Sequence, residues 1–167
     1  WDAGSDTSTI YDTVMEGMTG DNEAETSYLV YKQITGLSEG DVITGVAMDL
    51  YSASNSDIAV ALYSDSGNQP STLLQNGGND IVGEETGITI SNTYTTKVIA
   101  LDYTYTVPSG VEKVWVAGYP STQSHWRVNS GSGAYSDSVY HTSSPSPETR
   151  WDDYSSGGTP NGIWAFH

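Results

Sequence analysis

The chain has 167 residues, carries 21 Asp and Glu against 5 Lys and Arg, and has a formal net charge of −16. A surface this acidic repels phosphate backbones and anionic lipids, so nucleic acid and membrane surfaces are poor candidate partners. The absence of cysteine excludes a disulfide scaffold, a thiolate metal site and a cysteine nucleophile, and no apolar stretch is long enough to span a bilayer.

Residues 1–27 are mostly polar and are predicted to form an N-terminal arm, which could include a first strand, ahead of a body over residues 28–167. An arm with so few apolar side chains can anchor a strand but cannot build its own core. The larger apolar residues of the arm after Trp1, and hence its candidate assembly residues, are Ile10, Tyr11, Val14, Met15 and Met18.

The first half of the body contains three segments in which apolar residues alternate with polar or small ones, at 28–35, 42–51 and 58–63. Period-two alternation is typical of strands with one buried face. Val42 is predicted to lie on the same face as the core residues of its strand, and Ala59 and Ala61 are predicted to face outward. With a later strand, the predicted core is Val46, Met48, Leu50, Val60, Leu62, Val114 and Val116.

The second half begins with turn-forming residues at 64–70, a short turn at Leu73 and Leu74, and a Gly- and acid-rich surface excursion at 76–87. Residues 95–107 are predicted to be extended and residues 108–110 to form a turn. Residues 111–119 are the clearest strand, with Trp115 and Ala117 on the face opposite Val114 and Val116. Further strands are predicted at 126–128 and 163–166, and the segment 129–161 is expected to be irregular, with one or two short strands near 134–141.

Eight or nine short strands without helices predict an all-β, two-sheet antiparallel sandwich with under a tenth helix. The spacing leaves jelly-roll and immunoglobulin-like topologies open, although the lack of a Cys…Trp…Cys pattern argues against a true immunoglobulin domain.

One run, Ile58-Ala-Val-Ala-Leu-Tyr-Ser-Asp-Ser-Gly-Asn-Gln-Pro-Ser-Thr-Leu-Leu74, resembles a hairpin pattern of prokaryotic secreted modules. The same modules have a Val-Pro-Ser-Gly turn, matched at 107–110, and later segments similar to 114–118 and 128–136. The resemblance covers roughly residues 28–167. It implies a jelly-roll domain of the kind found in carbohydrate-binding modules, adhesins and viral fibres.

Catalysis is not expected from this sequence. His125, His141 and His167 lack metal-ligand spacing, and no nucleophile elbow, phosphate-binding loop or zinc-protease motif occurs. Asp152-Asp153 and Glu84-Glu85 are adjacent in sequence, so in an extended chain the two carboxylates of each pair point to opposite faces. We therefore expect a non-enzymatic protein with no certain cofactor.

A calcium site is the most plausible metal site, because sandwich loops supply the oxygen ligands that calcium prefers. Asp21, Glu23 and Glu25 offer carboxylates at alternate positions and are the first candidates. The alternative is that they are solvated turn residues.

Aromatic residues mixed with polar ones offer a second kind of site, since flat rings stack on sugars while polar neighbours bind hydroxyls. The candidates for carbohydrate contact are Trp126, Arg127, Arg150, Trp151, Asp152 and Tyr154. Packing is an equally good interpretation of Trp126 and Trp151. Trp115 and Trp164, inside strands, are predicted to be core.

Tyr and Trp are abundant (12 and 5) while Phe occurs once, and no Asn-x-Ser/Thr sequon is present. These features favour an extracellular or cell-surface protein of prokaryotic or viral origin. Two functions remain open: a self-assembling structural or adhesive subunit of a fibre or surface layer, and a polysaccharide-binding module. In the first, the partner is another copy of the chain, joined by strand addition of the arm.

Overall fold

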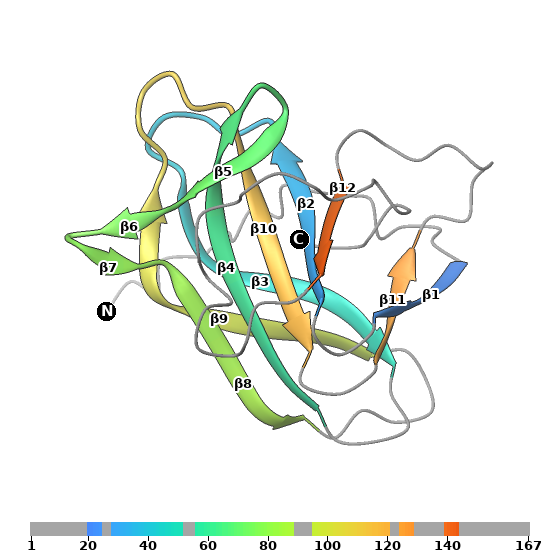
Figure 1. Ribbon diagram of the computed structural model, residues 1–167. Helices are drawn as coiled ribbons and strands as arrows, with labels where there is room; N and C mark the ends of the chain where they lie inside the picture. Colours follow the sequence, from blue (N-terminus) through green and yellow to red (C-terminus); the bar gives the residue numbers. More distant parts are fainter. Residues whose placement is uncertain are drawn as a thin grey trace, which may run out of the picture.

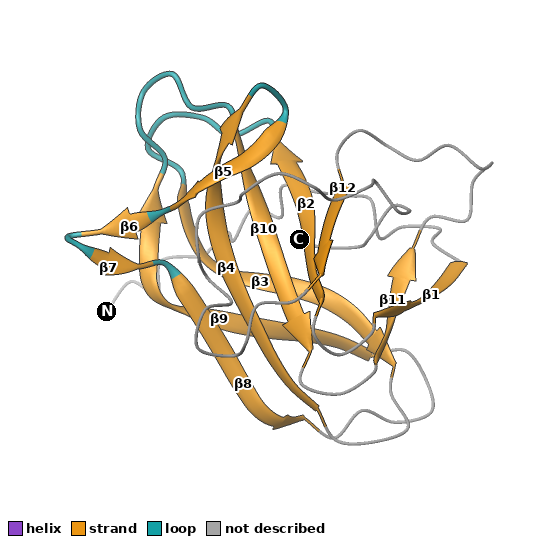
Figure 2. Cartoon of the chain, viewed as in Figure 1, coloured by secondary structure: helices purple, strands orange, loops and turns teal. Residues whose placement is uncertain are grey.

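The computed structural model describes residues 20–24, 28–51, 56–88, 95–120, 124–128 and 139–143 (Figure 1). These residues form strands and their connections, and Figure 2 shows no helix among them. The described chain accordingly contains no helix that is long and apolar enough to cross a membrane. The prediction of an all-β chain with antiparallel sheets is confirmed for this part of the protein.

The strands form two main sheets in which every pairing is antiparallel. The four-stranded sheet has the order β1 (Gly20–Ala24), β11 (Ser124–Val128), β3 (Val42–Tyr51) and β9 (Thr95–Thr106). The six-stranded sheet runs β12 (Val139–Ser143), β2 (Tyr28–Thr35), β10 (Lys113–Pro120), β4 (Ser56–Ser66) and β5 (Gln69–Leu73), with β8 (Val82–Ile88) also paired to β4. A small hairpin, β6 (Gln75–Asn76) and β7 (Asn79–Asp80), completes the described strands.

A hydrophobic core lies where the two main sheets meet. The four-stranded sheet contributes Val46, Ile99 and Leu101, and the six-stranded sheet contributes Val60, Leu62, Val114 and Val116 among others. Burying one such aliphatic side chain contributes roughly 1.5–3 kcal/mol. Five of the seven predicted core residues are thus confirmed, while the side chains of Met48 and Leu50 lie outside the described part of the structure.

The opposite face of the six-stranded sheet carries a second buried cluster built around aromatic residues. Trp115 and Tyr63 are 0% exposed, and the Tyr31 and Tyr63 rings meet edge to face with centroids 5.3 Å apart. The prediction that Trp115 is core is confirmed. Ala61, predicted with Ala59 to face outward, does lie on the face opposite Val60 and Leu62, but both alanines are buried because this sheet is covered on both faces.

The segment 58–74, which resembles a hairpin pattern, does form a hairpin, and its turn is tighter than the predicted loop over residues 64–70. Strand β4 continues to Ser66, and Ser66 pairs with Gln69, so only Gly67 and Asn68 form the turn. Both have positive φ, 63° and 62°, the conformation of the two-residue turn that suits twisted antiparallel strands. Glycine at the first position adopts it without strain, and asparagine tolerates it at the second. Leu73, predicted to be in a turn, ends strand β5.

The segment 76–87 was predicted to be a surface excursion, which holds for the exposed residues 76–80 and 84–86 but not for the buried Ile81 and Gly83. It contains the second strand of the small hairpin and most of β8, separated by Ile81, which is 0% exposed. The backbone amide of Ile81 donates to Leu74 and its carbonyl accepts from Leu62. Gly83 lies so close to β9 that a Cβ there would be 2.1 Å from the Ala100 carbonyl oxygen.

The pairing of β3 with β9 is interrupted by a bulge, and as a result Ile43 contacts the core where Val42 was predicted to do so. Ile43 pairs with Tyr105 but Gly45 pairs with Ala100, so residues 101–104 of β9 lie opposite the single residue Thr44. Such a bulge bends the strand and breaks the alternation of faces. Ile43 therefore packs against the core, while Val42, predicted to face it, is 52% exposed.

Candidate functional site

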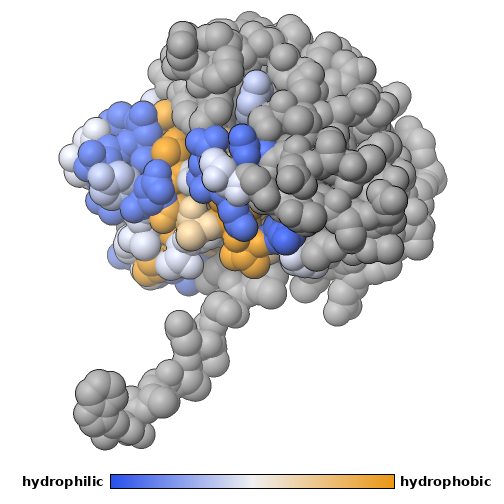
Figure 3. Space-filling view, turned by 90° about the horizontal axis from the view of Figure 1, so that it is seen from below, coloured by the Kyte–Doolittle hydropathy of each residue, from blue (hydrophilic) through white to orange (hydrophobic). Residues whose placement is uncertain are grey.

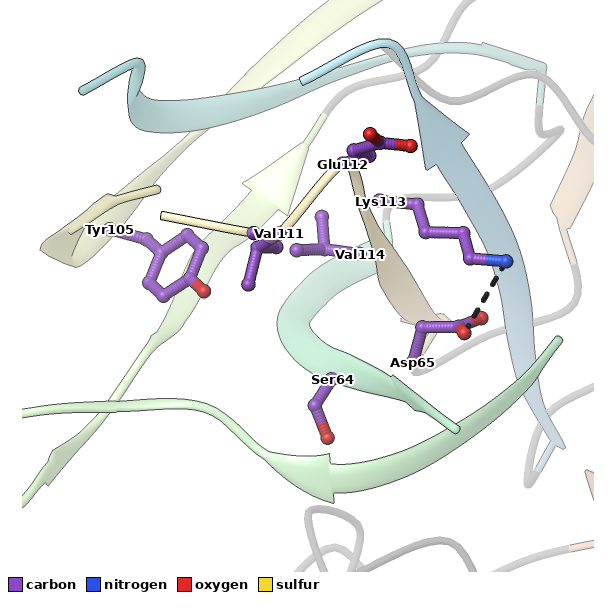
Figure 4. Close-up of a pocket in the computed structure, with 8 residues that line it drawn as sticks. Ser64, Asp65, Tyr105, Val111, Glu112, Lys113 and Val114 are labelled. Carbon is purple, nitrogen blue, oxygen red and sulfur yellow. Dashed lines mark ion pairs between the residues drawn. The ribbon is translucent and has the colours of Figure 1, made fainter. Parts of the chain in front are cut away.

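Three connections, β2–β3, β4–β5 and β9–β10, gather at one end of the described structure (Figure 1). Beside them lies a cavity of about 230 Å³, shown in Figure 4. The residues that line it are Ser64, Asp65, Tyr105, Gly110, Val111, Glu112, Lys113 and Val114.

Backbone hydrogen bonds between connections hold this end in place. Val107 donates to Asp41 (N–O 2.8 Å) and accepts from Gly40 (2.9 Å), and Leu37 donates to Glu112 (3.0 Å). The β9–β10 connection turns at Gly110, whose φ of 81° favours glycine. The predicted turn at 108–110 is confirmed, and the rim of the cavity is fixed by the main chain.

Asp65 is the centre of a polar cluster at the cavity wall. Its Oδ1 accepts hydrogen bonds from Gln33 Nε2 (2.7 Å) and from the indole Nε1 of the buried Trp115 (2.9 Å). The Lys113 ammonium lies 3.5 Å from Oδ2 and also donates to the side chain of Asn68 in the hairpin turn. The cluster joins β2, β4 and β10. Trp115 of β10 pairs with Gln33 of β2 on one side and with Tyr63 of β4 on the other, and Asp65 lies two residues beyond Tyr63 on β4.

The Asp65 carboxyl is held in its ionised form. Burial raises its pKa, but hydrogen bonds from Trp115 and Gln33, the charge of Lys113 and the Asn68 amide together bring the pKa below its ordinary value of 3.8. A carboxyl with a lowered pKa stabilises the fold above the pKa of the unfolded chain, and that contribution is lost as the pH falls through the folded pKa.

We expect Asp65→Asn to destabilise the protein by about 1 kcal/mol at pH 7, because bonds to a neutral amide are about half as strong as bonds to a carboxylate. The difference from wild type should shrink as the pH falls through the lowered pKa, below 3.8, since wild-type Asp65 is then neutral too. Urea unfolding of both proteins at pH 7 and across the acid range measures this. A difference that persists undiminished to the acid limit would show that Asp65 is not held ionised by the cluster.

The remaining polar groups of the cavity do not converge on a common point. The Ser64 hydroxyl is engaged with the backbone of Thr72, and Figure 4 shows it turned away from Tyr105, Val111 and Val114. The Asp65 carboxylate is turned toward Lys113. Burial raises the pKa of Tyr105 above 10.0, so its phenol stays protonated at neutral pH. The Ser64 hydroxyl and the Asp65 carboxylate are thus each held by neighbouring groups of the protein.

The structure describes the backbone of only two of the six predicted carbohydrate-contact residues. Trp126 and Arg127 lie in β11, opposite Asn22 and Asp21 of β1, on the four-stranded sheet. Their side chains are outside the described part, and so are Arg150, Trp151, Asp152 and Tyr154 in their entirety. Trp126 and Arg127 therefore belong to a different sheet from the Asp65 cluster, and the sugar-contact prediction stays a prediction.

The predicted calcium ligands Asp21 and Glu23 lie in strand β1, and Glu25 lies outside the described residues. The register places Asp21 opposite Arg127 and Glu23 opposite His125. Across the described ranges, no group of three or more His, Asp or Glu residues is arranged to hold a metal ion.

Exposed apolar side chains mark a second candidate site on the four-stranded sheet. The large exposed hydrophobic residues in the described ranges are Val98 (64%), Val42 (52%) and Tyr103 (43%), and all lie on β3 or β9. Figure 3 shows apolar residues reaching the surface between hydrophilic ones. The sequence Lys97-Val-Ile-Ala-Leu101 does not predict this exposed surface. Its apolar residues alternate between the buried and the exposed face of the strand, so the pattern does not separate the two faces. The predicted assembly residues Ile10, Tyr11, Val14, Met15 and Met18 lie outside the described residues.

No family model matches the sequence, no curated protein is significantly similar to it, and no solved structure matches its fold.

Proposed function

We propose that the protein is a non-catalytic, extracellular β-sandwich of jelly-roll type that assembles with copies of itself into a fibre or surface layer. The two antiparallel sheets that share the core around Val46, Val60 and Val116 support the sandwich. The acidic, cysteine-free, sequon-free composition supports an extracellular setting in a prokaryote or virus.

The observation that carries the proposal is the exposure of Val98 and Tyr103 on β9, a strand at the end of the four-stranded sheet. A long edge strand invites pairing with another chain, and natural proteins usually protect such edges with charges, proline or a short length. Strand β9 is 12 residues long, contains no proline, carries charges only at Lys97 and Asp102, and has a valine at its most exposed large apolar position. These are the properties of a strand edge that binds a partner.

The hydrogen bonds and the ion pair among the polar residues that line the cavity support the non-catalytic part of the proposal. Asp65, Lys113 and Ser64 are polar residues of the cavity lining, and each is bound to a neighbouring group of the protein. Groups that already satisfy one another stabilise a fold and are poorly available to a substrate.

The net charge of −16 sets the conditions under which assembly should occur. Like-charged subunits repel one another, and salt screens this repulsion over about 10 Å at 0.1 M. Assembly is therefore weaker at low ionic strength and stronger with divalent cations such as calcium.

Removing residues 1–19 should give a folded monomer that no longer assembles, because β1 begins at Gly20 and the deletion leaves every described strand intact. Sedimentation velocity in salt and calcium measures assembly, and the melting temperature shows whether the truncated protein is folded. Full-length protein that stays monomeric at high concentration in these conditions would contradict the proposal.

If the full-length protein stays monomeric, the second candidate function is that of a carbohydrate-binding module. The observation that favours it is the cavity beside Tyr105. Tyr105 provides an aromatic ring next to Val111 and Val114, and hydroxyl and carboxylate groups lie around the rim. Retardation of the protein in a polysaccharide-containing gel, lost on Tyr105→Ala, would support this candidate.

A further inference from the structure

We propose that Asn76 is a modification site, which deamidates spontaneously and thereby releases the β6–β7 hairpin from β9. The inference goes beyond the proposed function and is independent of whether the protein assembles. The reaction consumes only water and yields aspartate or isoaspartate at this position.

The β6–β7 hairpin places an asparagine directly before an uncovered turn. Asn76 pairs with Asn79, so Gly77 and Gly78 form a two-residue turn, and their φ values are 60° and 85°. Every residue from 75 to 80 is exposed, and Figure 1 shows the hairpin projecting from the sheets beside β9. No described atom lies within 4 Å of a Cβ built on Gly77, so the backbone around this residue is not shielded by a neighbour.

The sequence places the two groups that react in deamidation next to each other in the chain. The backbone nitrogen of Gly77 attacks the side-chain carbonyl carbon of Asn76 and forms a carbon–nitrogen bond. The bond from that carbon to Nδ2 breaks, and ammonia leaves with the Gly77 amide proton. Water then opens the resulting ring at one of its two carbonyl groups. Glycine favours the ring closure because it has no side chain to cover the attacking nitrogen and adopts conformations closed to other residues.

The other asparagines of the described strands and turns are less suited to this reaction. Asn22, Asn68 and Asn79 are followed by Glu, Gln and Asp, whose side chains cover the backbone nitrogen that would attack. The carboxylates of Glu and Asp also disfavour loss of the amide proton. Asn161, which likewise precedes a glycine, lies outside the described residues.

Asn76 also holds the hairpin against β9, so its conversion changes the structure. Its Nδ2 donates to the Thr104 carbonyl oxygen at 2.9 Å, and β6 contacts β9. Aspartate at this position is ionised at neutral pH and offers only acceptors, so the hydrogen bond is lost and the facing oxygens repel each other. Isoaspartate also adds a backbone carbon before the turn, which disturbs the pairing with Asn79. Each conversion adds one negative charge to the −16 of the chain.

Incubation of the folded full-length protein in warm, mildly alkaline buffer, followed by peptide mapping with mass spectrometry, tests the reaction. Fragment ions should place a gain of about 1 Da at residue 76, with residues 68 and 79 converting more slowly. Asn76→Gln, which keeps an amide but must close a larger ring, should abolish the gain at this position. Conversion at Asn68 or Asn79 as fast as at Asn76 would overturn the assignment.

Two further variants test the release of the hairpin. Asn76→Asp reproduces one product, and Asn79→Asp is the matched control, because it adds the same charge across the turn while the Asn79 amide donates to Asn76 within the hairpin and not to β9. Backbone hydrogen exchange over residues 75–81 should be faster in Asn76→Asp than in Asn79→Asp. Equal exchange in the two variants would show that Asn76 does not hold the hairpin against β9.

Discussion

Gly83→Ala should destabilise the protein by about 1–3 kcal/mol or more, because a Cβ at this position would lie 2.1 Å from the Ala100 carbonyl oxygen. The contacting atom belongs to the backbone of β9, so relief requires β8 and β9 to move apart. Gly83 is buried between the strands, with Ile81 0% exposed two residues away. Thermal unfolding should show the loss as a fall in Tm of roughly 2–4 °C per kcal/mol.

Gly78→Ala is the matched control, since Gly78 has a φ of 85° and no atom within 4 Å of its built Cβ. It should cost only the strain of a positive φ, about 1 kcal/mol. Equal effects of the two substitutions would mean that β8 does not approach β9 as closely as described.

Trp115→Ala should cost about 3–5 kcal/mol, the usual range for removing a fully buried tryptophan. Trp115 is 0% exposed on the face of the six-stranded sheet that lies away from the shared core, and its indole donates to Asp65. The substitution removes the largest side chain of the aromatic cluster and leaves one acceptor position on Asp65 without its donor. Urea unfolding followed by circular dichroism measures the change.

Val98→Ala serves as the comparison, because Val98 is 64% exposed and its truncation should change stability by less than about 0.5 kcal/mol. A cost for Trp115→Ala as small as that for Val98→Ala would mean that the second face of the six-stranded sheet is not a core.

The sequence predicts most accurately the strands in which apolar and polar residues alternate, because this pattern alone indicates which residues are buried. Strands β2 and β3 begin and end where the pattern places them, and the faces of β10 are divided between Val114 and Trp115 as predicted. In β10 the local pattern and the tertiary packing agree, which is the condition under which sequence patterns are reliable.

Strand β8 could not be predicted in the same way, because its partners are distant in the chain. Ile81, just before β8, is part of the hydrophobic core and bonds through its backbone to Leu62 and Leu74, and Gly83 is required by the approach of Ala100. A segment rich in glycine and acidic residues resembles a surface loop until those neighbours are known. The exposure of Val42 likewise depends on a bulge in the partner strand, which leaves no mark in its own sequence.

The polar cluster is hidden from the sequence for a related reason. Asp65 is 32 residues from Gln33 and 50 from Trp115, so no local motif connects them. Only the sheet register brings these positions together. The position of β9 at the end of its sheet is equally a property of sheet order, since a strand is at an edge only relative to its neighbours.

Negative-stain electron microscopy of the purified full-length protein, at high concentration in salt and calcium, tests the central claim most directly. Self-assembly through the exposed apolar residues of β9 predicts filaments or rings of repeating subunits, and their loss in a Val98→Asp variant. A Thr86→Asp variant, which adds the same charge at an exposed position of β8, should still assemble. A field of single particles of 17.9 kDa under all these conditions would contradict self-assembly.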